Sequence, residues 1–188
     1  RSLREILRQP AYRVAVLSGL VSYAVMSFIM TATPISMHVH DGFSSAQTTT
    51  VISAHLLGMY LPSLATPLIV RVLGLRAMLA AGVALIGVCV VISALVGHEF
   101  PHYFAGLVLL GLGWNLMFVA ATTLLTTTYS SEERCRAQAF NALAIFGSQA
   151  LASLLAGTAI LNLGWATLNL VSVPLLVELA PPAVAWLI

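Results

Sequence analysis

The amide of Asn115 and the indole of Trp114 are the side chains best placed to bind a solute, because both lie inside a long apolar run. That run begins at Tyr103 and extends for roughly 23 apolar or small residues, enough for a helix that crosses ~30 Å of hydrocarbon. An amide there is costly unless it faces protein or water. Asn115, Phe118 and Thr122 share one face at helical spacing. We expect Trp114, Asn115 and Phe118 to line a cavity, with hydrogen bonding between helices as the open alternative for Asn115.

His55 is the other side chain that could do chemistry within an apolar run. It could bind a substrate or carry a proton, or it could be a neutral histidine bonded to a neighbouring helix. Met26 and Met30 could form an adaptable apolar surface for varied solutes, with helix packing as the alternative. Gln149 completes the set of cavity-lining candidates, and it too could serve as a packing group.

The remaining reactive residues form no recognisable catalytic or metal-binding set. Cys89 and Cys135 have no metal-ligand spacing, and a disulfide between them is not expected. Four further histidines fall in predicted loops on one side, where a metal site stays open as a minor alternative: His38, His40, His98 and His102. Nucleophile triads, phosphate-binding loops and zinc-protease motifs are absent from the sequence. The sequence therefore predicts no enzyme, no catalytic residue, no bound metal and no cofactor.

The composition explains why so few side chains are reactive. The 188 residues are 60% hydrophobic and only 7% charged, with a mean hydropathy of +0.99. A water-soluble domain of this size would need far more polar surface to cover it. The net charge of +2 comes with no basic stripe, so nucleic acid is not an expected partner. We expect an all-α integral membrane protein in contact with the lipid bilayer.

Six transmembrane helices are predicted from the apolar runs and the turn signals between them. Residues 1–10 form a short basic amphipathic segment at the membrane surface, and residues 11–188 form the six-helix domain. Two capping boxes, Ser44 with Gln47 and Ser130 with Glu133, are expected to open the second and fifth helices. The predicted helices cover residues 12–37, 45–70, 77–96, 103–125, 131–161 and 165–188.

The arginines determine the predicted orientation. With six spans, every basic residue falls on one side of the membrane. Cytoplasmic loops carry the excess of positive charge in membrane proteins. Both termini are therefore expected in the cytoplasm, with the chain in the inner membrane. The residues concerned are Arg1, Arg4, Arg8, Arg13, Arg71, Arg76, Arg134 and Arg136.

Six spans divide into two triplets, residues 12–96 and 103–188, that run in opposite directions through the membrane. The turn at residues 71–76 resembles the loop between the second and third helices of the major facilitator superfamily, roughly Asp-Arg-x-Gly-x-Arg. Gly74 and Arg76 match that pattern, whereas Arg71 stands where the family has an acidic residue. The stretches 133–138, 58–63 and the start of the last helix at Trp165 are also similar to the family. The chain resembles one six-helix half of such a transporter, the C-terminal half.

The resemblance implies an architecture and a mechanism. The first helix of each triplet would face a central cavity, and the third would face lipid. Gly74, Arg76, Arg134 and Arg136 would act in gating at the cytoplasmic loops. Because the family has twelve helices, a second six-helix half would be needed, either from a homodimer or from a missing N-terminal half.

Our hypothesis from the sequence is membrane transport of a small solute by alternating access, as a half-size unit of a secondary transporter. Few charged residues lie in the spans, which favours a small organic or amphiphilic substrate. The alternative is an isolated membrane domain or scaffold that transports nothing.

Overall fold

The computed structural model describes residues 2–178, and every regular element in that part of the chain is helical. This confirms the predicted all-α class. The end of the predicted sixth helix, with Pro181 and Pro182, lies outside the described residues. The elements are, in chain order, α1 (Leu3–Arg8), α2 (Pro10–Pro34), the π-helical η1 (Ile35–His40), α3 (Ser45–Tyr60), the 3₁₀ segment η2 (Leu61–Ala65), α4 (Thr66–Val91), the π-helical η3 (Ile92–Val96), α5 (Phe100–Thr126) and α6 (Arg134–Val171).

Four helical stretches of the described chain are long and apolar enough to cross a membrane. They cover Pro10–His40, Ser45–Val96, Phe100–Thr126 and Arg134–Glu178. The second and fourth hold 52 and 45 residues. A straight helix of either length would extend about 70–80 Å, more than twice the ~30 Å of a hydrocarbon core.

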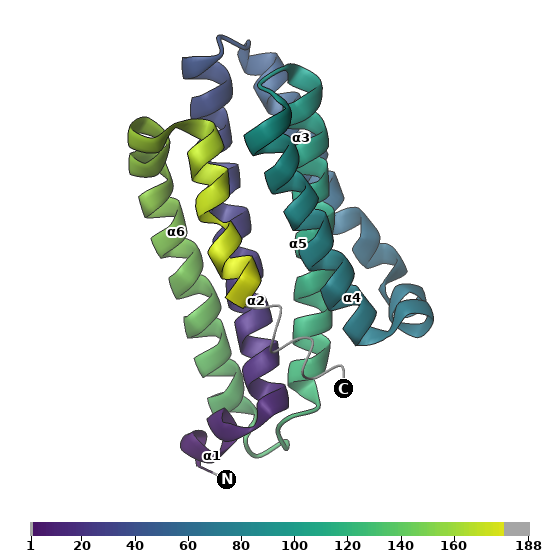
Figure 1. Cartoon of the computed structure of the whole chain (residues 1–188). Helices are drawn as coiled ribbons and strands as arrows, with labels where there is room; N and C mark the ends of the chain where they lie inside the picture. The colour runs from purple at the N-terminus through teal and green to yellow at the C-terminus, as the bar shows by residue number, and fades with distance from the viewer. Residues whose placement is uncertain (1, 179–188) are drawn as a thin grey trace.

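Each of the two longest stretches contains a glycine whose backbone is not helical. Gly74 has φ 73° and ψ 162°, and Gly164 has φ 73° and ψ 173°. Side chains other than hydrogen rarely tolerate this conformation, which explains why glycine occupies both positions. Both breaks lie inside turns that the sequence predicts, at residues 71–76 and 162–164. Figure 1 shows the ribbon turning back on itself in both stretches, so the last part of α6 runs beside its first part.

Glycine contacts set how closely α5 packs against its neighbours. The helix α5 contacts α2, α3 and α4, and α2 contacts α6. A Cβ at Gly111 would lie 2.5 Å from the carbonyl oxygen of His55, and one at Gly113 would lie 2.8 Å from that of Gly82. The absence of side chains therefore lets α5 approach the backbones of α3 and α4 directly.

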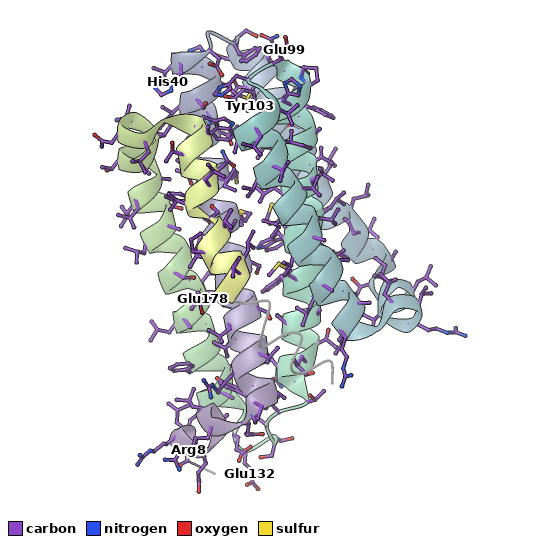
Figure 2. All side chains as sticks on the ribbon, in the orientation of Figure 1. Arg8, His40, Glu99, Tyr103, Glu132 and Glu178 are labelled. Carbon is purple, nitrogen blue, oxygen red and sulfur yellow. The ribbon has the colours of Figure 1, made fainter. Side chains whose placement is uncertain are left out.

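The two ends of the bundle differ in their polar residues. Figure 2 shows Arg8 and Glu132 at one end, and His40, Glu99 and Tyr103 at the other. At the first end, the hydroxyl of Tyr12 donates to the carbonyl of Ala137 at 2.8 Å and ties the start of α2 to the start of α6.

Two predicted loop boundaries were wrong. The first predicted helix continues through η1, so His38 and His40 are helical rather than in a loop. Glu99 and His102 form a capping box that starts α5 at Phe100, which places His102 inside that helix. Both cases reflect local backbone pairing that apolar periodicity does not reveal.

The two predicted capping boxes differ in outcome. Ser44 and Gln47 form both halves of the box that opens α3. At α6 only one half forms: the Ser130 N–H donates to the Glu133 carboxylate at 2.9 Å, and no side-chain cap bonds the helix N-terminus. Glu133 itself is the N-cap residue, so α6 begins at Arg134.

Candidate solute-binding wall

Five aromatic rings from four helices meet at one place in the bundle. Tyr23 of α2 lies at the centre, with its ring centroid 5.1 Å from Trp114, 5.2 Å from Phe118 and 5.9 Å from Phe146. Trp114 and Phe118 stack on each other at 5.1 Å, one helical turn apart on α5. Tyr60 of α3 meets Trp114 at 6.2 Å. We call these five residues the ring cluster.

The ring cluster is buried at its base and open at its sides. Trp114 is only 3% exposed, whereas Tyr60 and Phe146 are 60% and 58% exposed. The indole N–H of Trp114 is covered and finds no hydrogen-bond acceptor within residues 2–178. The cluster therefore combines the stacked pair Trp114 and Phe118 with two largely exposed rings. It also contains one buried hydrogen-bond donor, the indole N–H.

Asn115 binds to the point where α3 loses its regular form. Its Nδ2 donates to the carbonyl of Met59 at 2.7 Å and to the hydroxyl of Ser63 at 2.6 Å. Pro62 has no N–H, and the chain continues as the 3₁₀ segment η2. A 3₁₀ turn pairs each N–H with the carbonyl three residues earlier, which leaves the Met59 carbonyl free for Asn115. The amide thus links α5 to η2, in keeping with the interhelical alternative.

His55 also bridges α3 and α5. Its Nδ1 lies 2.8 Å from the carbonyl of Leu107. Because a carbonyl only accepts, Nδ1 carries the hydrogen and Nε2 is the acceptor. That Nε2 is covered and has no partner in the described part of the chain.

The other predicted cavity-lining residues lie outside the ring cluster. Met26 is buried in the same apolar core as Trp114, and Met30 and Phe118 are half-buried against that core. Gln149 is half-buried on α6, one residue from Ser148, whose hydroxyl donates to the carbonyl of Ile145 at 2.7 Å. Trp114 and Phe118 are therefore the predicted residues that belong to the ring cluster, with Asn115 and His55 on the α3–α5 boundary.

The predicted gating residues lie at the two loops that the sequence indicated. Gly74 forms the break in α4, and Arg76 is exposed two residues later. Arg134 and Arg136 are exposed at the start of α6.

Sequence reasoning missed three members of the ring cluster, Tyr23, Tyr60 and Phe146. Each lies near the middle of its apolar run, away from the run's ends. Because tyrosine and tryptophan usually gather at the membrane surface, a mid-run tyrosine was an available signal.

A second polar group, at the other end of α5, was also missed. The hydroxyl of Tyr103 donates to Asp41 Oδ2 at 2.7 Å and accepts from the hydroxyl of Ser36 at 2.6 Å. His98 Nδ1 lies 3.5 Å from the same carboxyl oxygen. The Tyr103 ring also packs on Trp165 with centroids 5.0 Å apart. This group joins η1, the loop before α5 and the last part of α6.

Comparisons with individual proteins and with a family profile agree on one family. The chain is 38% identical to the riboflavin transporter RfnT of Brucella anthropi, over 98% of this chain and 48% of that protein. It is 32% identical to YdeG of Bacillus subtilis, an uncharacterised transporter of the major facilitator type, over 89% of this chain and 39% of that protein. The chain spans about half the length of these relatives or less. No solved structure matches it significantly. A sequence profile described as Major Facilitator Superfamily matches residues 15–188, so the chain belongs to that superfamily.

Proposed function

We propose that this chain forms one half of a carrier that moves a small organic solute across the inner membrane by alternating access. The observation that carries the proposal is the family match, which extends over nearly the whole chain, from residue 15 to residue 188. The family and the apolar helices make the chain an integral membrane protein of a transporter family. Proteins of this kind move solutes without reacting with them, so we expect no enzyme activity.

Six membrane crossings are part of this proposal. The breaks at Gly74 and Gly164 divide the two longest apolar stretches into two segments each. Each long stretch would then supply two crossings, and the other two stretches one each. This arrangement supports two triplets of opposite direction, residues 12–96 and 103–188, as in half of a major facilitator fold.

Both termini would lie in the cytoplasm. In Figure 2, Arg8 lies at the same end of the bundle as the loop that carries Glu132, next to Arg134. An excess of arginine on one side favours the cytoplasmic face there. The loops predicted at the opposite end, residues 38–43 and 97–102, contain Asp41, His98 and Glu99 and no arginine.

The solute is expected to be uncharged or weakly charged. Helical residues of the proposed spans contain no Asp, Glu, Lys or Arg over the ranges 14–40, 45–70, 77–96, 100–126 and 137–177. A strongly charged solute would need counter-charges from the other half. Riboflavin is the first solute to test, because a relative with 38% identity is named as its transporter.

A second six-helix half would complete the cavity. Large apolar side chains on η2 and α6 are exposed, with Leu64 at 83% and Leu154 at 77%. A second copy of the chain or a missing N-terminal half could cover part of this surface. The mass of the purified chain in a lipid nanodisc would distinguish a homodimer from a monomer that assembles with a different six-helix half.

Vesicle flux tests the proposal directly. The chain is reconstituted alone and together with the N-terminal half of a relative, and riboflavin entry is followed by its fluorescence. We expect saturable entry in at least one preparation and none in protein-free vesicles. A monomer that moves neither riboflavin nor other small solutes in either preparation would instead support a non-transporting membrane module.

A further inference from the structure

We propose that the ring cluster is a stacking site that selects solutes with a planar, fused heteroaromatic core. The proposal rests on the proposed transport function and names the class of solute that this part of the wall would recognise. The five rings come from α2, α3, α5 and α6, so the site exists only when these helices are packed together.

The depth of the two tyrosines points to a water-filled cavity. Tyr60 is the sixteenth residue of α3 and lies roughly 23 Å along the Ser45–Val96 stretch, far from its start. Among the described residues, neither the Tyr60 hydroxyl nor the Tyr23 hydroxyl has a hydrogen-bond partner. A phenol hydroxyl left without a partner in lipid is unfavourable, because it loses its hydrogen bonds to water. The exposed edge of Tyr60 is therefore expected to face water or a solute rather than acyl chains.

The ring geometry leaves surface available for stacking. Trp114 and Phe118 are nearly parallel, with 14° between their planes, whereas Tyr60 and Phe146 meet their neighbours at 73° and 71°. An edge-to-face contact uses one edge or one face of a ring and leaves the rest open. Because Tyr60 and Phe146 are both more than half exposed, each retains uncovered ring surface. A flat solute that stacks on either ring would bind at this exposed surface.

The buried donor favours a heteroaromatic solute over a hydrocarbon. The Trp114 N–H has no acceptor in the described part of the chain, and a buried donor without an acceptor lowers stability. Ring nitrogens and ring carbonyls of a heteroaromatic solute are acceptors. The side chains that cover the N–H would have to move aside for such an acceptor to reach it, and Tyr23 is one of the rings packed on the indole.

Two probes separate recognition of the ring from recognition of the rest of the solute. Lumichrome carries a fused three-ring core without a polyol, and ribitol is a polyol without a ring. Binding of each to the chain in lipid nanodiscs is measured by equilibrium dialysis. We expect saturable binding of lumichrome and at least tenfold weaker binding of ribitol.

Substitutions then assign the effect to the rings. Tyr60→Leu and Phe146→Leu remove exposed rings and keep apolar bulk, so folding is preserved. Each should weaken lumichrome binding about fivefold or more, because stacking of one ring contributes ~1–3 kcal/mol. Phe104→Leu is the matched control: Phe104 is also exposed, but its ring contact is with Phe100 and not with the cluster. That variant should bind lumichrome as the unmodified chain does.

Each outcome decides one of the two proposals. Equal binding of lumichrome and ribitol, or unchanged lumichrome binding in both Tyr60→Leu and Phe146→Leu, overturns the stacking site. If riboflavin flux persists in that case, the transport proposal stands alone. If lumichrome binding depends on the rings but no solute crosses the membrane, the stacking site stands and the transport proposal fails.

Discussion

Asn115 shows how one side chain can link two helices at a point of irregular backbone. Its amide donates to a carbonyl and a hydroxyl on the far side of the α3–α5 boundary, where η2 has released the Met59 carbonyl. Hydrogen bonds between membrane helices contribute modestly, on average ~0.6 kcal/mol with a maximum near 1.7, because the unfolded chain in lipid also finds partners.

Asn115→Leu should therefore lower the stability of the chain by about 1–2 kcal/mol, since it removes two such bonds and leaves the Met59 carbonyl and Ser63 without their donor. Denaturant unfolding in detergent micelles measures the change. Asn162→Leu is the control, because the Asn162 amide donates only within α6, to the carbonyl of Thr158. Equal stability of the two variants would show that the Asn115 bonds contribute nothing.

Tyr103 joins three segments at the end of the bundle opposite the arginines (Figure 2). Tyr103→Phe keeps the ring packed on Trp165 but loses the bonds to Asp41 and Ser36. We expect amide hydrogen exchange in residues 35–43 to become severalfold faster, since each lost bond contributes ~0.5–1.5 kcal/mol.

Tyr129→Phe serves as the control for that exchange measurement. Tyr129 precedes α6 and its hydroxyl accepts from Gln138, far along the chain from η1. It should leave exchange in residues 35–43 unchanged. If amide hydrogen exchange in residues 35–43 of the Tyr103→Phe chain is as slow as in the unmodified chain, ring packing alone holds η1 in place.

At the scale of the helices, close crossing depends on missing side chains. The Gly111 position lies so near the His55 carbonyl oxygen, 2.5 Å from an added Cβ, that the backbones must separate to admit a methyl group. His55 Nδ1 bonds α5 one turn away, so separation would also strain that hydrogen bond.

Gly111→Ala should destabilise the chain by about 1–3 kcal/mol, which is the usual cost of overpacking. Gly157→Ala on α6 meets open space and should be neutral or slightly stabilising, since alanine favours the helix by up to ~1 kcal/mol. Thermal unfolding in detergent compares the two. A stable Gly111→Ala chain would mean that α3 and α5 separate without loss of packing.

At the scale of the whole molecule, the proposed arrangement of six crossings would place distant loops on the same side of the membrane. Cys135 is exposed at the start of α6, and Val72 is 70% exposed beside the break in α4. Val39, 66% exposed, lies at the opposite end in η1. Cys89 is buried and should not react.

A membrane-impermeant maleimide tests this arrangement in intact cells and in inverted vesicles. Native Cys135, and Val72→Cys in a Cys135→Ser background, should react only in inverted vesicles. Val39→Cys in the same background should react only in intact cells. Labelling of positions 72 and 135 from opposite faces would refute six crossings and the transport proposal built on them.

Local features of the sequence were sufficient for the class, the apolar runs and the turns. The length of an apolar run and the φ that only glycine adopts are properties of neighbouring residues, so the breaks at Gly74 and Gly164 fall within predicted turns. Helix ends were less predictable: His40 and His102 are helical because of backbone pairing and a capping box. The hydrogen-bond partner of Asn115 could not be predicted either, because the Met59 carbonyl that η2 leaves free lies 56 residues away from Asn115 in the sequence.

The sequence by itself determined that this is a membrane protein, because its apolar runs are long enough to span a bilayer, and its profile match determined the superfamily. What only the tertiary structure decided is which faces of the helices meet. Lipid is as apolar as the core, so hydrophobicity does not distinguish a lipid-facing side from a packed one. The ring cluster around Tyr23 could therefore be found only once four helices were placed together.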